Sequence, residues 1–161
     1  MISNELLELQ KRNAAVFEQI SDSIWDCPET RFNEYRSSAK IKDCLAESGF
    51  SIKEGIGGLP TAFVAEKGSG NPVIAICGEY DALPSLSQHA DCKFHNPIVK
   101  GGPGHGCGHH LLGVGAMEAA VLVAELAQRG TVRYYGCPGE EGGAGKAFMA
   151  RSGCFDGCDA A

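Results

Sequence analysis

The residues with the clearest capacity for chemistry lie between Gly101 and His110, in the stretch GGPGHGCGHH. Cys107 and His109 are separated by one glycine, and in an extended backbone two residues at this spacing point to the same side. A thiolate and an imidazole together suit zinc or another late divalent ion better than magnesium or calcium. The alternative for this pair alone is a glycine-rich loop with incidental histidines, so the interpretation depends on a second group of ligands.

The adjacent carboxylates Glu140 and Glu141 form that second group. They follow an alternating, strand-like run at residues 131–135, and glycines flank them on both sides. Neighbouring residues at the end of a strand point to opposite sides, so one glutamate could bind a metal while the other faces a substrate. Metal hydrolases need such a pair, because a free carboxylate must take a proton from the attacking water. A solvated acidic turn is the alternative, but the glycines and the preceding strand favour a site.

Two further carboxylates, Glu79 and Asp81, follow a short apolar run at residues 73–77. Such a run is typical of a strand buried on both faces of an α/β sheet, and open α/β sheets place ligands at the carboxyl ends of their strands. Two glycine-rich lookalikes are excluded. Residues 142–146 lack the spacing and the Ser/Thr of a phosphate-binding loop, and residues 101–108 lack the third glycine of a dinucleotide fingerprint.

The elements that must position these groups follow from the apolar periodicity and the turn residues. Predicted helices cover residues 4–26, 33–48, 111–128 and 143–152. Predicted strands cover residues 50–53, 62–66, 73–77 and 131–135. Ser3 is expected to cap the first helix, and Gly49 to end the second. Residues 84–104 show no periodicity, and an irregular segment of this length is typical of a functional loop. Residues 155–161 are interpreted as a chain that enters a further strand.

Composition limits the class of protein. The chain has 161 residues, 43% of them hydrophobic and 21% charged, which is ordinary for a globular domain with a real core. A net charge of −6 without any basic run argues against a nucleic-acid partner. No apolar stretch is expected to be long enough to span a membrane, and the N-terminus lacks the pattern of a signal peptide. We therefore expect a cytoplasmic protein in which the eight cysteines are free thiols.

Three motifs carry a family resemblance. The stretches GEYDALP at 78–84, HGCGH at 105–109 and YGCPGEEGG at 135–143 resemble the amidohydrolase branch of the aminoacylase and carboxypeptidase-G-like dinuclear metallopeptidases. The resemblance extends along essentially the whole chain. It implies the α/β class, with residues 1–161 as the N-terminal part of a three-layer α/β/α zinc-peptidase-like catalytic domain. The rest of that domain, further ligand histidines and a lid domain for dimerisation would lie beyond residue 161.

The resemblance also implies a role for each motif residue. Cys107 would be a metal ligand that bridges two ions, and His109 and Glu141 would be ligands as well. Glu140 would be the general base, and Asp81 would support the site from behind the ligands.

Three other positions are treated separately. His105 precedes the ligand cysteine and would contact either the substrate or the ligands. His110 occupies a position that is not a ligand in the family, and we predict that it is not one here. Glu79 stands where related peptidases carry a ligand histidine, so its role stays open.

These roles imply a metal-dependent amidohydrolase that uses two divalent ions, and manganese and zinc both fit the ligands. Its small-molecule substrate would be an N-acyl amino acid, with p-aminobenzoyl-glutamate the first candidate, or a related dipeptide. The full-length protein would be a homo- or hetero-oligomer, and the 161-residue chain by itself would be inactive. The alternative is a non-catalytic metal-binding or partner subunit of a hetero-oligomeric hydrolase. A redox function is disfavoured because no Cys-x-x-Cys pair exists.

Overall fold

The fold is built on a mixed sheet whose strands stand in the order β1-β2-β4-β3. The computed structural model describes residues 4–161, so the predicted cap at Ser3 lies outside the described residues. The strands are β1 (Ser51–Glu54), β2 (Phe63–Ser69), β3 (Val73–Glu79) and β4 (Gly130–Cys137). β2 pairs antiparallel with both β1 and β4, whereas β3 and β4 run parallel. The four predicted strands are therefore confirmed, with small shifts at their ends.

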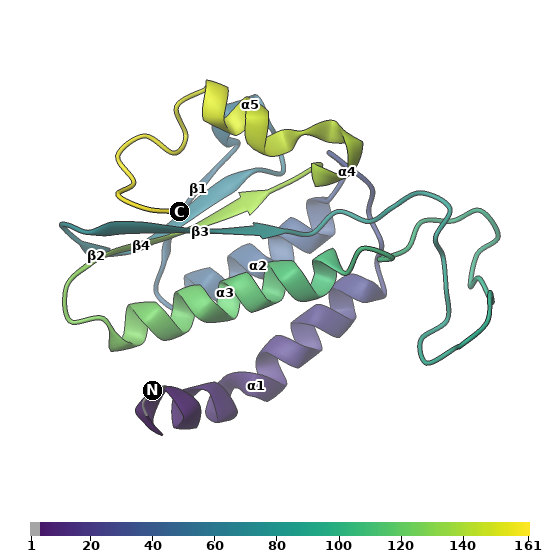
Figure 1. Ribbon diagram of the computed structural model, residues 1–161, viewed down its shortest axis with the longest axis horizontal. Helices are drawn as coiled ribbons and strands as arrows, with labels where there is room; N and C mark the ends of the chain where they lie inside the picture. The colour runs from purple at the N-terminus through teal and green to yellow at the C-terminus, as the bar shows by residue number, and fades with distance from the viewer. Residues whose placement is uncertain (1–3) are drawn as a thin grey trace.

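Helices cover both faces of this sheet (Figure 1). One face carries α1 (Asn4–Trp25), α2 (Tyr35–Glu47) and α3 (His109–Leu126), and the other carries α4 (Glu140–Gly143) and α5 (Gly145–Arg151) with the short 3-10 helix η1 (Ile56–Gly58). Each face has its own apolar core. Phe17, Ile41, Met117 and Tyr134 belong to the first core, and Ile56, Tyr135 and Met149 to the second. The predicted three-layer α/β/α arrangement is confirmed.

The close approach of α3 to the sheet explains its small residues. A Cβ on Gly113 would lie 2.3 Å from the backbone oxygen of Glu79, so only glycine allows the helix to pack this tightly on β3. The buried Tyr134 hydroxyl donates a hydrogen bond to the Gly113 oxygen at 3.1 Å and fixes the contact. The α3 N-terminus is thereby held beside the carboxyl end of β3.

Among the described residues, α3 is long and apolar enough to cross a membrane, with a mean hydropathy of 1.3. The expectation that no apolar stretch reaches this length was therefore wrong. Core helices meet the same criteria, and α3 packs against β3 and α1.

Two irregular segments complete the chain. The connection from β3 to α3 contains no helix or strand and extends away from the sheet, closed at its base by paired hydrogen bonds of 3.0 Å between Leu83 and Gly104 (Figure 1). After α5, residues 155–157 form turns rather than the start of a strand. Pairing begins later, where Ala160 forms a parallel bridge with Ile74 on the outer edge of β3.

Candidate metal centre

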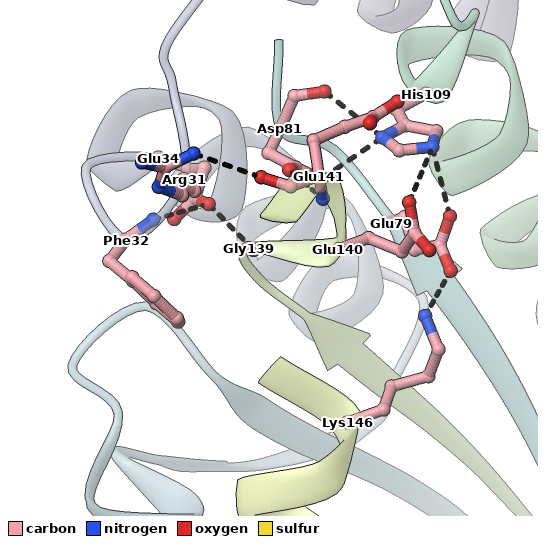
Figure 2. Close-up of polar contacts among 10 residues, drawn as sticks. All are labelled: Arg31, Phe32, Glu34, Glu79, Asp81, His109, Gly139, Glu140, Glu141 and Lys146. Atoms are coloured by element: carbon pink, nitrogen blue, oxygen red, sulfur yellow. Dashed lines mark hydrogen bonds and ion pairs between the residues drawn. The ribbon is translucent and has the colours of Figure 1, made fainter. Parts of the chain in front are cut away.

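Three segments that are distant in sequence meet at one edge of the sheet (Figure 2). Glu79 and Asp81 come from the end of β3, His109 begins α3, and Glu140 and Glu141 follow β4. β3 and β4 are parallel, so their carboxyl ends lie at the same edge, where α/β sheets bind their ligands. The right-hand part of Figure 2 shows these side chains directed toward His109.

The backbone around Cys107 and His109 is not extended as predicted. Gly108 adopts a left-handed conformation with φ +86°, and His109 is the first residue of α3. The N–H of Gly108 donates to the His105 oxygen at 3.2 Å, which closes a turn immediately before the helix. The two side chains were expected on one side because alternate residues of an extended backbone point the same way, and this reason was wrong. The turn nevertheless brings the ligand atoms of Cys107, His109 and Glu141 within 4.8 Å of one another.

His109 is oriented by Asp81. Its Nδ1 lies 3.0 Å from Asp81 Oδ1 and 3.1 Å from the Asp81 backbone oxygen, and two acceptors at one nitrogen indicate that Nδ1 carries a proton. Nε2 is then the nitrogen left with a lone pair for a metal ion. The other Asp81 oxygen accepts the Glu141 N–H at 2.9 Å, so this buried carboxylate ties the helix to the turn after β4. A carboxylate behind a ligand histidine is a usual second layer of metal sites.

The charges of this pair reinforce each other. The hydrogen bond that His109 donates to Asp81, which outweighs the effect of burial, raises the pKa of His109 above its ordinary value. Burial by itself would raise the pKa of Asp81, but the hydrogen bonds from His109 and the Glu141 N–H outweigh it, and the pKa is lowered. Asp81 is therefore an anion that can stabilise a cation at His109.

Glu79 and Glu140 form a second group with the same histidine. Glu79 Oε2 lies 3.1 Å from His109 Nε2, and Glu140 Oε2 lies 3.8 Å from it. The ligand atoms of these three residues also lie within 4.8 Å of one another. Lys146, from α5, forms an ion pair with the other Glu79 oxygen. Glu79, whose role stayed open, thus lies directly at the centre.

The two glutamates after β4 do not alternate as residues of a strand would. Gly139 and Gly142 adopt left-handed conformations, and Glu141 has a non-helical ψ of 90° inside α4. Because of this tight turn, both glutamates join a group with His109, and the strand alternation from which their opposite directions were predicted is absent. They differ in environment: the Glu140 side chain is 42% exposed, whereas Glu141 lies beside Cys107.

The donor set fits divalent cations. A thiol, an imidazole and four carboxylates gather in a small volume, and Lys146 is the lysine paired with one of them. The hydrogen bond with Glu141 is the main cause that raises the pKa of the exposed Cys107 thiol. A bound cation would reverse this effect, because a coordinated thiol loses its proton. Because Nδ1 is protonated, His109 can bind one ion through Nε2, and a second ion beside it would be held by other donors of these two overlapping groups.

His105 and His110 belong to a different environment. His105 is buried, its Nε2 lies 3.2 Å from the Ile24 oxygen, and burial is the main cause that lowers its pKa to about 4. His110 is also buried, with its ring centroid 5.0 Å from that of Trp25. Neither belongs to the ligand groups found among residues 4–161. His110 lies outside these groups, and its role as a non-ligand stays a prediction, whereas His105 lies against the end of α1.

Sequence reasoning missed three residues of this region. Lys146 was considered only in an excluded phosphate loop, although it is the one lysine after the glutamate pair. Arg31 NH1 donates to the Glu141 backbone oxygen at 3.4 Å, and the fully buried Glu34 accepts the Gly139 N–H at 2.8 Å. Nothing in the local pattern of either residue predicts a partner more than a hundred positions away.

Comparisons with known proteins were made with both the sequence and the structure. No family model matches the chain. The chain is 51% identical to one subunit of the p-aminobenzoyl-glutamate hydrolase of Escherichia coli, over 90% of its own length and 31% of that protein. It is 31% identical to the Xaa-Arg dipeptidase of Mus musculus, over 95% of its length and 37% of that protein. The chain thus spans about a third of the length of these curated relatives.

A solved structure of a similar protein agrees with these sequence matches. The Bacillus subtilis YXEP protein, described as a dinuclear metal binding peptidase from the M20 family, superimposes with a TM-score of 0.78 and 29% identity. The match covers 92% of this chain and 42% of that one.

Proposed function

Because this chain belongs to the M20 family of dinuclear metal-binding peptidases, we propose that its full-length protein is a metal-dependent amidohydrolase. The reaction would be hydrolysis of the amide bond of an N-acyl amino acid. The observation that carries the proposal is the pair of overlapping ligand groups around His109, one of which includes the more exposed Glu140. A hydrolase needs this combination of metal ligands and an accessible base.

Each residue has a role that follows from its position. Cys107, His109 and Glu141 would hold a divalent ion, and Glu79 lies close enough to His109 to take part in a second one. Bound ions would polarise the substrate carbonyl and make water easier to deprotonate. Glu140 is the better base, because its side chain is half-exposed and can reach both water and substrate. It would take a proton from water and return it to the leaving amine.

Asp81 would act through His109. It keeps the Nδ1 proton in place, so that Nε2 faces the ligand groups, and it fixes the turn that carries the two glutamates. Manganese and zinc both fit a site of mixed thiolate, imidazole and carboxylate ligands. The 51% identity with a subunit of a p-aminobenzoyl-glutamate hydrolase makes p-aminobenzoyl-glutamate the first substrate to test.

A second candidate rests on the same relative. Its name describes a subunit of a hydrolase, which supports a hetero-oligomer in which this protein needs a partner or serves one without catalysis of its own. Assays of the full-length protein with and without a co-purifying subunit distinguish the two. We propose a cytoplasmic location for either form.

The test uses the full-length gene product loaded with Mn²⁺ or Zn²⁺. Glu140→Gln should keep its metal content and lose about a hundred- to ten-thousandfold in kcat, since a positioned base contributes about 10²–10⁴. Glu141→Gln is the matched control, because it should lower the metal content as well as the turnover. Retained turnover in Glu140→Gln would refute the assignment of the base.

A further inference from the structure

A pocket lies beside the metal centre and is not explained by the metal ligands. Its volume is about 280 Å³. The residues that line it are Thr30, Arg31, Asn33, Ala82, Pro84 and Glu141. Glu141 belongs both to this pocket and to the candidate ligand group, so the pocket adjoins the metal centre.

Arg31 is the cation of this pocket. Its guanidinium donates one hydrogen bond, to the Glu141 backbone oxygen at 3.4 Å, and among residues 4–161 it forms no ion pair with a carboxylate. Its side chain runs over Gly142 and Gly143, where an added Cβ would lie 3.2 Å from NH1 and 3.5 Å from Cδ. Arg31 therefore keeps a full positive charge and spare N–H donors at the edge of an acidic site.

The loop that carries Arg31 is held rigidly. Phe32 adopts φ +63°, a conformation that is uncommon for a bulky residue and persists only where the surroundings impose it. The Phe32 N–H donates to the buried Glu34 carboxylate at 2.7 Å, and the same Glu34 oxygen accepts the Gly139 N–H at 2.8 Å (Figure 2). Thr30 forms a parallel bridge with Ala82. The backbone that carries Arg31 is thus preorganised relative to the turn after β4.

Charge and distance indicate what this pocket would take. Four carboxylates at the metal centre repel an anionic ligand, and Arg31 offers the planar fork that binds a carboxylate through two parallel hydrogen bonds. The carboxylates of an acylated glutamate lie three to five bonds from the scissile carbonyl carbon, which is roughly 4–6 Å through space because bond angles shorten the path. Glu141 spans a comparable distance, since its backbone oxygen contacts Arg31 and its side chain joins the ligands.

We propose that Arg31 binds a free carboxylate of the amino-acid part of the substrate in this pocket. Lys146 is less suited to this role because its ammonium already pairs with Glu79. The proposal rests on the proposed amidohydrolase function, since it assigns the leaving group of that reaction to the side of the metal centre where Arg31 lies. Substrates whose amino acid is acidic would gain most from this contact.

The test compares Arg31→Gln with the wild-type full-length metalloenzyme on three substrates. These are p-aminobenzoyl-glutamate, its α-carboxamide and its γ-carboxamide, which is p-aminobenzoyl-glutamine. We expect Arg31→Gln to raise KM for the diacid about ten- to a hundredfold with little change in kcat, the pattern of lost substrate binding. The variant should change KM less than about twofold for the one amide that lacks the carboxylate bound by Arg31. Arg36→Gln, in the same part of the chain but outside the pocket, should behave as wild type.

Two results would overturn the proposal. An equal loss on all three substrates would show that Arg31 only braces the glycine turn, and no loss on the diacid would show that the pocket does not bind it. If the wild type hydrolyses none of the substrates, the proposed function fails, and titration calorimetry with p-aminobenzoyl-glutamate tests Arg31 separately. Weaker binding to Arg31→Gln than to the wild type supports the assignment. Equal binding, or none to the wild type, refutes it.

Discussion

Replacement of Glu34 tests how the turn after β4 is held in place. The side chain is fully buried, and its Oε1 accepts the N–H groups of Phe32 at 2.7 Å and Gly139 at 2.8 Å. Its Oε2 accepts the hydroxyl of Thr61 at 2.8 Å. One carboxylate thus joins the loop before α2, the segment before β2 and the turn that carries the glutamate pair.

Glu34→Ala removes both acceptor oxygens, breaks all three hydrogen bonds and leaves a cavity. The Gly139 N–H and the Thr61 hydroxyl are buried, and a buried donor without a partner costs about 1–3 kcal/mol. We therefore expect a loss of about 2–5 kcal/mol in the free energy of unfolding. Metal affinity should fall as well, because the turn loses the hydrogen bond at its first residue.

Glu34→Gln should be much milder and should depend on pH. The amide oxygen can accept both N–H groups, and the Thr61 hydroxyl can rotate to accept from the amide nitrogen, so we expect a change of about 1 kcal/mol or less at pH 4. Burial, which outweighs the hydrogen bonds, raises the pKa of Glu34 above its ordinary value of 4.5. The folded protein then keeps this proton to a higher pH than the unfolded chain.

The pH dependence of stability has a definite sign. The stability that the Glu34 carboxyl contributes is present below pH 4.5 and is lost as pH rises through the pKa of the folded state. Glutamine does not ionise, so the free energy of unfolding of Glu34→Gln should increase relative to wild type between pH 4 and pH 7. Urea unfolding followed by circular dichroism measures both variants, with the exposed Glu47→Ala as the control. The reasoning is refuted if Glu34→Ala unfolds at the wild-type urea concentration, or if glutamine costs as much as alanine at pH 7.

Three further changes test the site and the packing beneath it. Gly113→Ala should destabilise the fold by about 1–3 kcal/mol in urea titrations, because its Cβ would lie 2.3 Å from a backbone oxygen of β3. Gly115→Ala is the control, because a Cβ there would have no atom within 4 Å, and it should stabilise α3 by up to about 1 kcal/mol. Equal effects of the two substitutions would contradict this packing. Asp81→Asn should weaken metal binding about 10–100-fold by calorimetry, since it loosens His109, and unchanged affinity would argue against that role. Cys107→Ser should abolish the thiolate-to-metal charge-transfer absorption of the cobalt-loaded protein, and a persistent band would exclude Cys107 as a ligand.

The sequence by itself determined the α/β class and the segments that carry the chemistry. Apolar runs bounded by glycine and proline located all four strands, because strand burial and turn conformations depend on nearby residues. Since β3 and β4 run parallel, the carboxylates after them had to meet at one edge. The grouping of Cys107, His109 and Glu141 was predicted from their residue types and from the resemblance of the motifs.

Only the tertiary structure decided which atoms face one another. Alternation predicted the wrong backbone at Cys107 and at the glutamate pair, because left-handed glycines at 108, 139 and 142 replace extended chain by tight turns. The contacts of Arg31 and Glu34 with the turn after β4 join residues more than a hundred positions apart. Such partners depend on how the sheet brings distant segments together. Local sequence patterns reflect the conformational preferences of neighbouring residues, and they contain no information on contacts between distant segments.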